Sequence, residues 1–286
     1  MSLMVAVAYA GFGSGMLALV PLAQAGIDAW GWRETYRIMF WGCLVILPLL
    51  ALLPWGRIPG GAPGDPRAEA RHGRRRRVTS DKAHWTVGRA MRTAEFWLLA
   101  QAFFFTAVAS YLTSVQMISF LISMDYPPLA AALAFGVAGM LSIFGVILSG
   151  WASVWFGFRR STLVSFAGTL IEVLALLAYA RWPHPALVWL FIVTFGTSQG
   201  ARGPVISALN ARIFAHGRVS SIYGLIFTLM SFGSAVGASL SGRLHAWTGD
   251  YAAAFLLAAV AVLVAAAPFL LTRRLIDAQE KPPPVV

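Results

Sequence analysis

The feature that most constrains this chain is a series of long runs without Asp, Glu, Lys or Arg. Seven such runs each reach the 18 or so residues that a helix needs to cross a hydrocarbon core of about 30 Å. They are Met1–Ile27, Ile38–Gly56, Phe96–Met124, Tyr126–Phe158, Trp182–Ala201, Val219–Gly242 and Tyr251–Thr272. An eighth apolar segment, Ser161–Ala180, contains Glu172 as its one charged residue. The sequence therefore predicts an all-α polytopic membrane protein with eight transmembrane helices.

The composition agrees with this class of protein. Of the 286 residues, 58% are hydrophobic and 12% are charged, whereas an average soluble domain carries about 25% charged residues. Eight helices of roughly 20 residues each use more than half of the chain. The rest is too short to house an extramembrane catalytic domain, so we expect that the protein is not an enzyme.

Motifs for cofactors and metals are not evident in the sequence. Cys43 is the single cysteine and can form neither an intramolecular disulfide nor a thiolate metal cluster. There is no GxGxxG, Walker, HExxH or CxxC motif and no Ser-His-Asp order. An intramembrane enzyme would need an acid, base or metal set, which Glu172 and Arg202 do not supply. The sequence predicts no cofactor and no metal, and nothing in it supports the use of ATP.

The basic residues are distributed unevenly over this topology. The net charge is +11, from 22 Lys/Arg and 11 Asp/Glu. If the loop after the second helix is cytoplasmic, 17 Lys/Arg lie on that side and four lie opposite, at Arg33, Arg37, Arg181 and Arg243. This is the positive-inside pattern, and it predicts that both termini are cytoplasmic. Because the pattern accounts for the whole net charge, nucleic acid is not expected as a partner.

A Pro- and Gly-rich segment with the run Arg74–Arg77 separates two predicted helices from the following six. We expect residues 54–94 to form a disordered basic cytoplasmic linker. It would join two spans at 1–53 to a six-helix bundle at 95–272, which is followed by a cytoplasmic tail at 273–286. Two roles fit the arginine run: binding of anionic lipid headgroups, or a solvated determinant of topology.

Two parts of the sequence repeat one pattern. Each part has a helix rich in small residues, a short outer turn with Gly and an aromatic residue, and a strongly apolar second helix. The first unit turns at Gly31 and the second at Gly249. Transporters built from repeated helix bundles have internal duplications of this kind.

Three stretches carry a resemblance to a known family of membrane proteins. A Gly-rich helix leads to Gly31-Trp32-Arg33. After the basic linker, Glu95–Leu99 opens a helix that contains Phe103–Phe105. The third stretch, Gly150–Arg160, is a short cytoplasmic segment. Together they resemble the major facilitator superfamily, in its monocarboxylate-porter-like and oxalate/formate-antiporter-like branch.

The third stretch is similar to the family's cytoplasmic signature, Gly-x-x-x-Asp-Arg-x-Gly-Arg-Arg. The resemblance implies a cytoplasmic gating loop, and four residues match the signature: Gly150, Gly157, Arg159 and Arg160. Val154 and Trp155 stand in place of the acid and the first arginine.

The resemblance implies an architecture and an activity. The chain corresponds to spans five to twelve of a twelve-helix major facilitator fold, so we expect that the first four spans are missing, through a truncated or mis-started reading frame or a natural split protein. The implied activity is secondary active transport of small organic anions, mono- or dicarboxylates, by proton symport or exchange. We expect a multi-pass protein of the cell membrane, in a bacterial inner membrane. The alternative is a non-transporting truncated membrane interaction protein or remnant.

Arg202 stands out because a charged side chain at mid-membrane costs about 2.5 to 3.5 kcal/mol on insertion scales. It follows Gln199 and lies among Gly200, Gly203 and Pro204, which are expected to interrupt the helix. A guanidinium can hold a carboxylate through two parallel hydrogen bonds, so Arg202 and Gln199 are predicted to bind substrate. In the alternative, Arg202 extends its side chain to the headgroups near the helix end.

Three further polar residues lie inside predicted helices. Glu172 is either a proton-coupling site or a structural hydrogen-bonding group. The family resemblance makes its helix peripheral, which favours the structural role. Gln116 and Tyr111 belong to a helix that borders the central cavity in the family. They are predicted substrate contacts, with helix-to-helix hydrogen bonding as the alternative.

Overall fold

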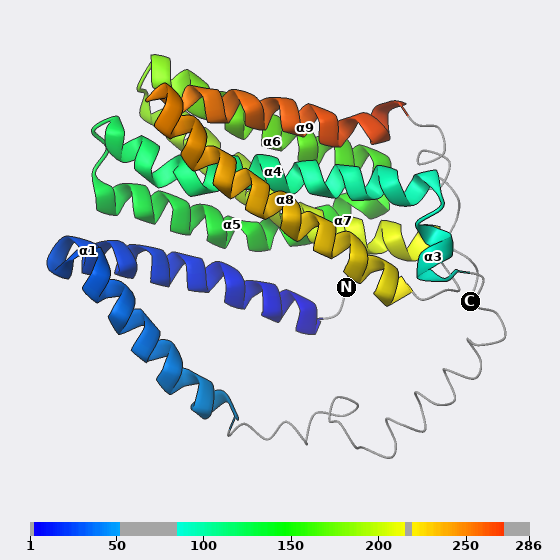
Figure 1. Ribbon diagram of the computed structural model, residues 1–286, viewed down its shortest axis with the longest axis horizontal. Coiled ribbons are helices and arrows are strands. Elements are labelled where there is room, and N and C mark those ends of the chain that lie inside the picture. The colour runs from blue at the N-terminus through cyan, green and yellow to red at the C-terminus, as the bar shows by residue number, and fades with distance from the viewer. Residues whose placement is uncertain (1–2, 52–84, 215–218, 272–286) are drawn as a thin grey trace.

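The computed structural model describes residues 3–51, 85–214 and 219–271. Its helices are α1 (Leu3–Ala51), α3 (Val87–Ala90), α4 (Ala94–Ser123), α5 (Pro128–Trp155), α6 (Gly157–Arg181), α7 (Pro185–Ile213), α8 (Val219–Thr248) and α9 (Ala252–Leu271) (Figure 1). No strand occurs among the described residues. The predicted all-α fold is confirmed for this part of the chain.

Five of the described helices are long and apolar enough to cross a membrane. They are α4, α8, α9 and the main parts of α5 and α6, at Pro128–Ser153 and Arg159–Arg181. In α7, the apolar stretch Pro185–Ala201 is shorter than these spans. The fold is thus that of a polytopic helical membrane protein, and the count of eight spans stays a prediction.

Helix α1 consists of two arms that meet at Gly31. There the backbone leaves the helical conformation, with φ 76° and ψ 162°, and the chain folds back on itself (Figure 1). The corresponding turn between α8 and α9 contains Gly249 at φ 70°. Because residues other than glycine rarely adopt positive φ, both repeat units need glycine at this point. The predicted turn with glycine is confirmed in both units.

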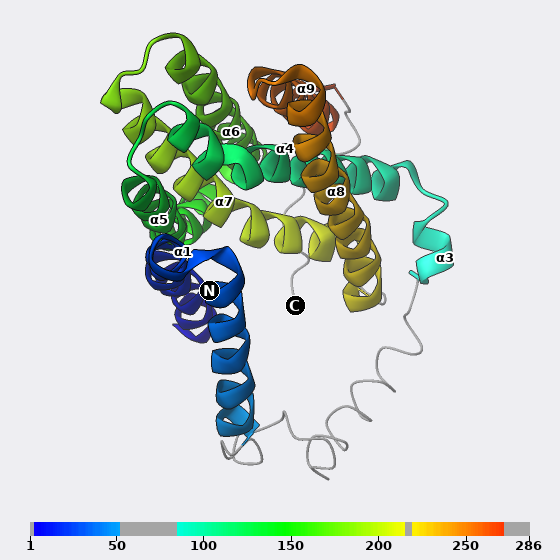
Figure 2. The same cartoon turned by 60° about the vertical axis from the view of Figure 1, so that its left-hand side comes forward.

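The helices pack side by side in a regular order. α4 lies along α8 and α9, α6 lies along α9 and α7, and α5 lies along α7. The first arm of α1 lies along α5, where Met16 and Leu17 rest against Gly139 and Gly136. The second arm runs away from the other helices, as both views show (Figures 1 and 2).

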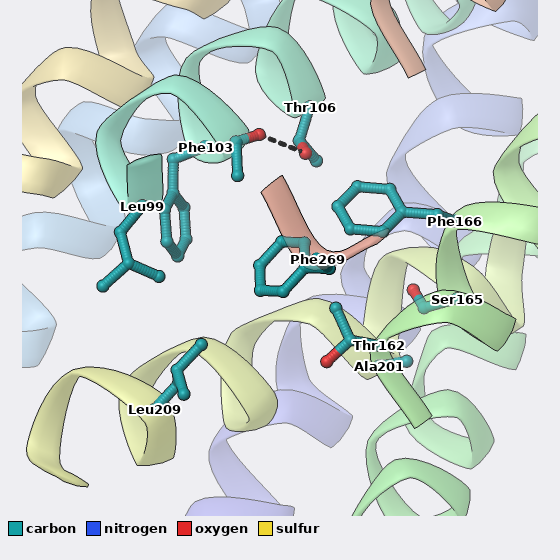
Figure 3. Close-up of a pocket in the computed structure, with 10 residues that line it drawn as sticks. Leu99, Phe103, Thr106, Thr162, Ser165, Phe166, Ala201, Leu209 and Phe269 are labelled. Atoms are coloured by element: carbon teal, nitrogen blue, oxygen red, sulfur yellow. Dashed lines mark hydrogen bonds between the residues drawn. The ribbon is translucent and has the colours of Figure 1, made fainter. Parts of the chain in front are cut away.

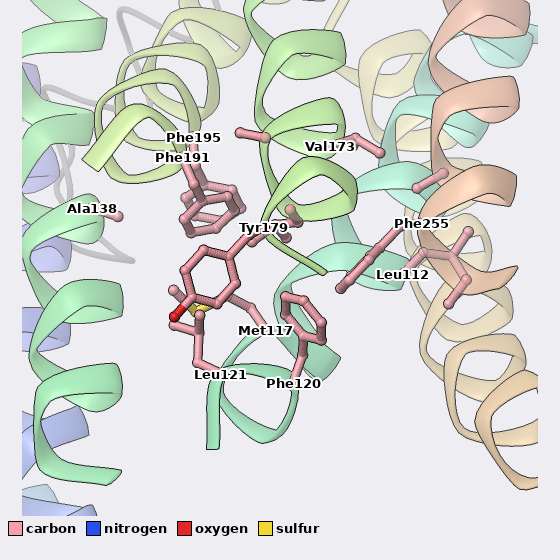
Figure 4. Close-up of a cluster of buried hydrophobic side chains, with 14 of the residues drawn as sticks. Leu112, Met117, Phe120, Leu121, Ala138, Val173, Tyr179, Phe191, Phe195 and Phe255 are labelled. Carbon is pink, nitrogen blue, oxygen red and sulfur yellow. The ribbon is translucent and has the colours of Figure 1, made fainter. Parts of the chain in front are cut away.

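Two clusters of buried side chains hold the bundle together. The larger one surrounds Phe120 of α4, whose ring meets those of Phe255 and Tyr179 edge-on, with centroids 5.1 and 6.1 Å apart (Figure 4). The smaller cluster surrounds Phe96 and Phe214, near the other end of α4. Since lipid is as apolar as these side chains, helix association in a membrane depends on such close packing.

The end of the predicted linker is folded. Residues 54–84 lie outside the described residues, but α3 follows them and buries Ala90. Trp85 packs edge-on against Phe214 of α7, with ring centroids 5.4 Å apart. The expected disorder therefore does not hold for residues 85–93, because apolar side chains anchor this segment to the bundle.

Candidate functional site

Helix α7 carries two of the residues predicted to bind substrate. It is continuous over Pro185–Ile213, so the predicted interruption at Gly200, Gly203 and Pro204 is wrong. Gly200 serves close packing instead, because a Cβ at this position would overlap the Ser142 carbonyl oxygen of α5. Small residues at a helix interface allow such an approach of two backbones in a membrane.

The same kind of contact recurs along the α5–α7 interface. A Cβ at Gly196 of α7 would overlap the Ala138 carbonyl oxygen, and a Cβ at Gly145 of α5 would overlap the Thr197 carbonyl oxygen. The two helices are therefore held together backbone to backbone over more than one turn. This firm contact positions the polar segment of α7 beside α5.

A groove of about 560 Å³ lies between α5 and α6, with α7 as its floor. We call it the α5–α6 groove. It is lined by Gly145, Leu148, Ser149, Trp151, Ala152, Phe156, Arg160, Ser161, Val164, Ser165, Gly168, Thr197, Ser198 and Ala201. The Ser165 hydroxyl donates a hydrogen bond to the Ser198 carbonyl oxygen at 3.3 Å, which joins α6 to α7.

A second cavity, of about 30 Å³, lies inside the bundle between α4, α6, α7 and α9 (Figure 3). Phe103, Phe166 and Phe269 form much of its wall. The Thr106 hydroxyl turns back and donates to the Ala102 carbonyl oxygen at 2.6 Å. Since a cavity needs about 10–15 Å³ of such volume for one water molecule, this one is too small for an organic anion.

The two cavities share part of a wall, because Ala201 and Ser165 border both. Gln199 and Arg202 flank Ala201 along α7. Gln199 is half-buried and has an interaction partner, whereas the side chain of Arg202 lies outside the described residues. The α7 segment that bears both predicted ligands thus runs along the shared wall.

The predicted contacts on α4 lie elsewhere. Tyr111 is 43% exposed and packs beside Gly237 of α8, whereas Gln116 is buried. Neither residue lines either of the two cavities. Within the part of the chain that the structure describes, the α4 and α7 candidates therefore do not meet in one of these cavities.

Glu172 is fully buried in α6 and lines neither of these cavities. Ser165, Thr169 and Glu172, at positions i, i+4 and i+7, share one face of the helix, and all three are buried. Glu172 has an interaction partner. Its position agrees with a structural role, and proton coupling stays a prediction.

The predicted gating loop is a tight turn between α5 and α6. Gly157 has φ 80°, and Gly150 lies within α5 rather than in the turn. Arg160 is exposed and lines the α5–α6 groove, whereas Arg159 is half-buried. Neither arginine forms an ion pair with a described residue. In the sequence, Val154 stands in place of the acid of the family signature.

Two hydroxyl residues of α6 that line the α5–α6 groove, Ser161 and Ser165, are not among the site residues predicted from the sequence. Ser161, Ser165 and Thr169 recur at every fourth position of α6 and are buried. This spacing places them on one helix face. The periodic pattern of hydroxyls is the signal by which they could have been found.

Known proteins with similar sequences are transporters. The family model described as Major Facilitator Superfamily matches residues 1–202. Monocarboxylate transporter 13 of Rattus norvegicus is 28% identical over 273 residues, which cover 95% of this chain and 59% of the rat protein. Monocarboxylate transporter 11 of Homo sapiens is 28% identical over 269 residues, covering 91% and 54%. Monocarboxylate transporter 4 of Mus musculus is 26% identical over 261 residues, covering 90% and 53%.

This chain spans between about half and three fifths of the length of these relatives. The matches confirm the resemblance to the monocarboxylate-porter-like branch, and the matched proteins are transporters rather than enzymes. Together with the apolar helices, they identify a multi-pass membrane protein. The chain belongs to the Major Facilitator Superfamily.

Proposed function

We propose that this chain forms part of a secondary active transporter that moves small organic anions, mono- or dicarboxylates, by proton symport or exchange. The observation that carries the proposal is the match of 95% and 91% of the chain to monocarboxylate transporters 13 and 11. The matches cover only 59% and 54% of those proteins. Transport is therefore proposed for a carrier that contains further helices.

In this proposal the chain contributes eight transmembrane helices. The two arms of α1 are the last two spans of one half of the carrier, and α4 to α9 form the other half. The distribution of Lys and Arg favours cytoplasmic termini and a cytoplasmic linker. Exposed apolar side chains on the second arm of α1, such as Phe40 and Trp41, offer a surface on which the further helices pack.

The relatives named above are mammalian, and the bacterial inner membrane is a prediction from the sequence alone.

Arg202 is the proposed ligand for the carboxylate of the substrate. It is the first charged residue along α7, and Gln199 lies one turn before it. A guanidinium donates two parallel hydrogen bonds to a carboxylate, a geometry that a lysine ammonium does not reproduce. Gln116 and Tyr111 of α4 are proposed as further substrate contacts.

Glu172 is the candidate for proton coupling, because it is the one acidic residue of α6 and is fully buried. Glutamine at this position keeps the size of the side chain but cannot ionise. If Glu172 couples transport to protons, Glu172→Gln abolishes uptake driven by a pH gradient and retains exchange of labelled for unlabelled substrate. If the role is structural, the two activities change together.

The test is uptake of radiolabelled lactate by proteoliposomes that contain the complete carrier, meaning this chain assembled with a complementing four-span segment. We expect saturable uptake that unlabelled mono- or dicarboxylates reduce and that a neutral sugar does not. Absence of competition by any carboxylate would contradict the proposed function.

The role of Arg202 has its own variants. Arg202→Lys is expected to reduce uptake severely, while Arg181→Lys, at the exposed end of α6, serves as the matched control and retains uptake. Surface abundance is measured alongside. Normal uptake by Arg202→Lys would favour the alternative in which this side chain reaches the headgroups.

A further inference from the structure

The α5–α6 groove exists because two consecutive helices pack on a third rather than on each other. α5 and α6 are joined through Phe156 alone, yet each lies more extensively against α7 than against its neighbour in the chain. Gly145 of α5 and Gly168 of α6 approach Thr197 and Ser198 of α7 so closely that a Cβ at either glycine would overlap α7. These positions therefore contribute no side chain that fills the space between α5 and α6.

The mouth of the groove is apolar and open. Leu148 of α5 and Val164 of α6 line it and are 54% and 70% exposed. Both helices contain candidate membrane spans. The opening between two spanning helices lies at the depth of the hydrocarbon core, so its occupant must be stable there.

One end of the groove is positively charged rather than apolar. Arg160 lines it there, exposed and without an ion pair to any described residue. Trp151 and Phe156 lie beside this end and meet edge-on, with ring centroids 5.9 Å apart. Tryptophan is enriched at the level of the headgroups. A cation and an aromatic pair at this level suit a negatively charged headgroup.

We propose that the α5–α6 groove binds one anionic phospholipid, with its phosphate on Arg160 and an acyl chain between Leu148 and Val164. The groove volume of about 560 Å³ lies within the usual range of ligand sites, about 300–1,000 Å³. The turn before Arg160, between α5 and α6, is predicted to be cytoplasmic, and anionic lipids are concentrated in the cytoplasmic leaflet. The site is independent of which solute the carrier moves.

The test is a titration of the purified, delipidated chain in neutral detergent with phosphatidylglycerol or phosphatidylcholine of the same acyl chains. Native mass spectrometry counts the bound lipids. We expect one tightly held phosphatidylglycerol, bound about fivefold more strongly than phosphatidylcholine, since one basic residue near a membrane surface contributes about that factor. Arg160→Gln should remove the preference, and Arg181→Gln, at the other end of α6, should keep it.

A second pair of variants tests the groove itself. Val164→Trp fills the mouth and should cause loss of the tightly bound lipid of either kind. Leu174→Trp is the matched control on α6, because Leu174 is also exposed, at 50%, and does not line the groove. Equal binding of the two lipids by the unmodified chain, or unchanged binding by Val164→Trp, would overturn the proposal. Displacement of phosphatidylglycerol by lactate or inorganic phosphate would also overturn it, by making the groove a site for soluble anions.

Discussion

The second arm of α1 and helix α9 hold corresponding places in the two repeat units, but their surroundings differ. Each follows a turn with a positive-φ glycine, Gly31 or Gly249. α9 packs against α4 and α6, and its Phe255 is fully buried. In the second arm of α1, Phe40 is 59% exposed. The repeat therefore determines the local turn, whereas burial depends on the helices that surround it.

The second arm touches the rest of the described chain mainly near its turn. Thr35 lies against Gly26 of the first arm, and its hydroxyl donates to the Gly31 carbonyl oxygen at 2.9 Å. From Tyr36 to Ile46, every side chain except the half-buried Met39 is exposed. An apolar helix with this exposure is suited to contact lipid or further helices of the proposed carrier.

The largest expected difference between the two helices comes from removing an aromatic ring. Phe255→Ala should lower the free energy of unfolding by about 3 kcal/mol or more, because it leaves a cavity beside Phe120. Phe40→Ala should change it by less than about 0.5 kcal/mol. Unfolding in mixed detergent micelles measures both values. Equal losses would show that the second arm is packed as tightly as α9.

Substitutions of glycine by alanine also compare the packed bundle with the exposed second arm of α1. Gly200→Ala should destabilise the bundle by about 1–3 kcal/mol, because the added methyl group overlaps the Ser142 carbonyl oxygen. Gly42, in the second arm, faces open space where an added methyl group would lie. Gly42→Ala should therefore be neutral or stabilise the helix by up to about 1 kcal/mol. If Gly42→Ala lowered the free energy of unfolding, another helix would have to pack against Gly42.

The two turns can be compared directly. Alanine at Gly31 or at Gly249 meets a backbone strain of about 1–3 kcal/mol at positive φ. Gly249→Ala should lower the thermal stability of the bundle, because α9 is part of its core. Gly31→Ala should alter the α1 hairpin and leave the melting temperature of the bundle nearly unchanged. A similar drop of the melting temperature in both variants would show that the stability of the bundle depends on the second arm of α1, contrary to this account.

The smallest expected difference between the second arm and α9 is in the accessibility of a spin label, for which the single cysteine provides an attachment site. Cys43 is exposed on the second arm, so a spin label there should collide freely with oxygen dissolved in the bilayer. In a Cys43→Ser background, a label at Ala258→Cys should collide less, because Ala258 is buried in α9. Electron paramagnetic resonance measures both rates. A low rate at Cys43 in the chain alone would indicate that another element already covers the arm.

The helices were largely predictable from the sequence, because uncharged runs and their flanking charges are local features. The run Tyr251–Thr272 anticipates α9, which is Ala252–Leu271. The glycine turns were predictable for the same reason. Gly200 was misread, because its role depends on Ser142 of a different helix, and no local pattern reveals that neighbour.

The candidate site was predictable only in part. Arg202 is predicted as a ligand from the sequence because a charge inside an apolar helix is conspicuous, and this role stays a prediction. The α5–α6 groove could not, since it arises from how α5 and α6 pack on α7. The separation of Tyr111 and Gln116 from these cavities likewise depends on packing, which spacing along one helix does not determine.

The central claim is that the exposed second arm of α1 belongs to an interface of a larger carrier. The most direct test is uptake of radiolabelled lactate by proteoliposomes, with the 286-residue chain alone and with the same amount of chain assembled with a complementing four-span segment. We expect no saturable uptake by the chain alone and restored uptake by the assembly. Robust saturable uptake by the chain alone would contradict this account.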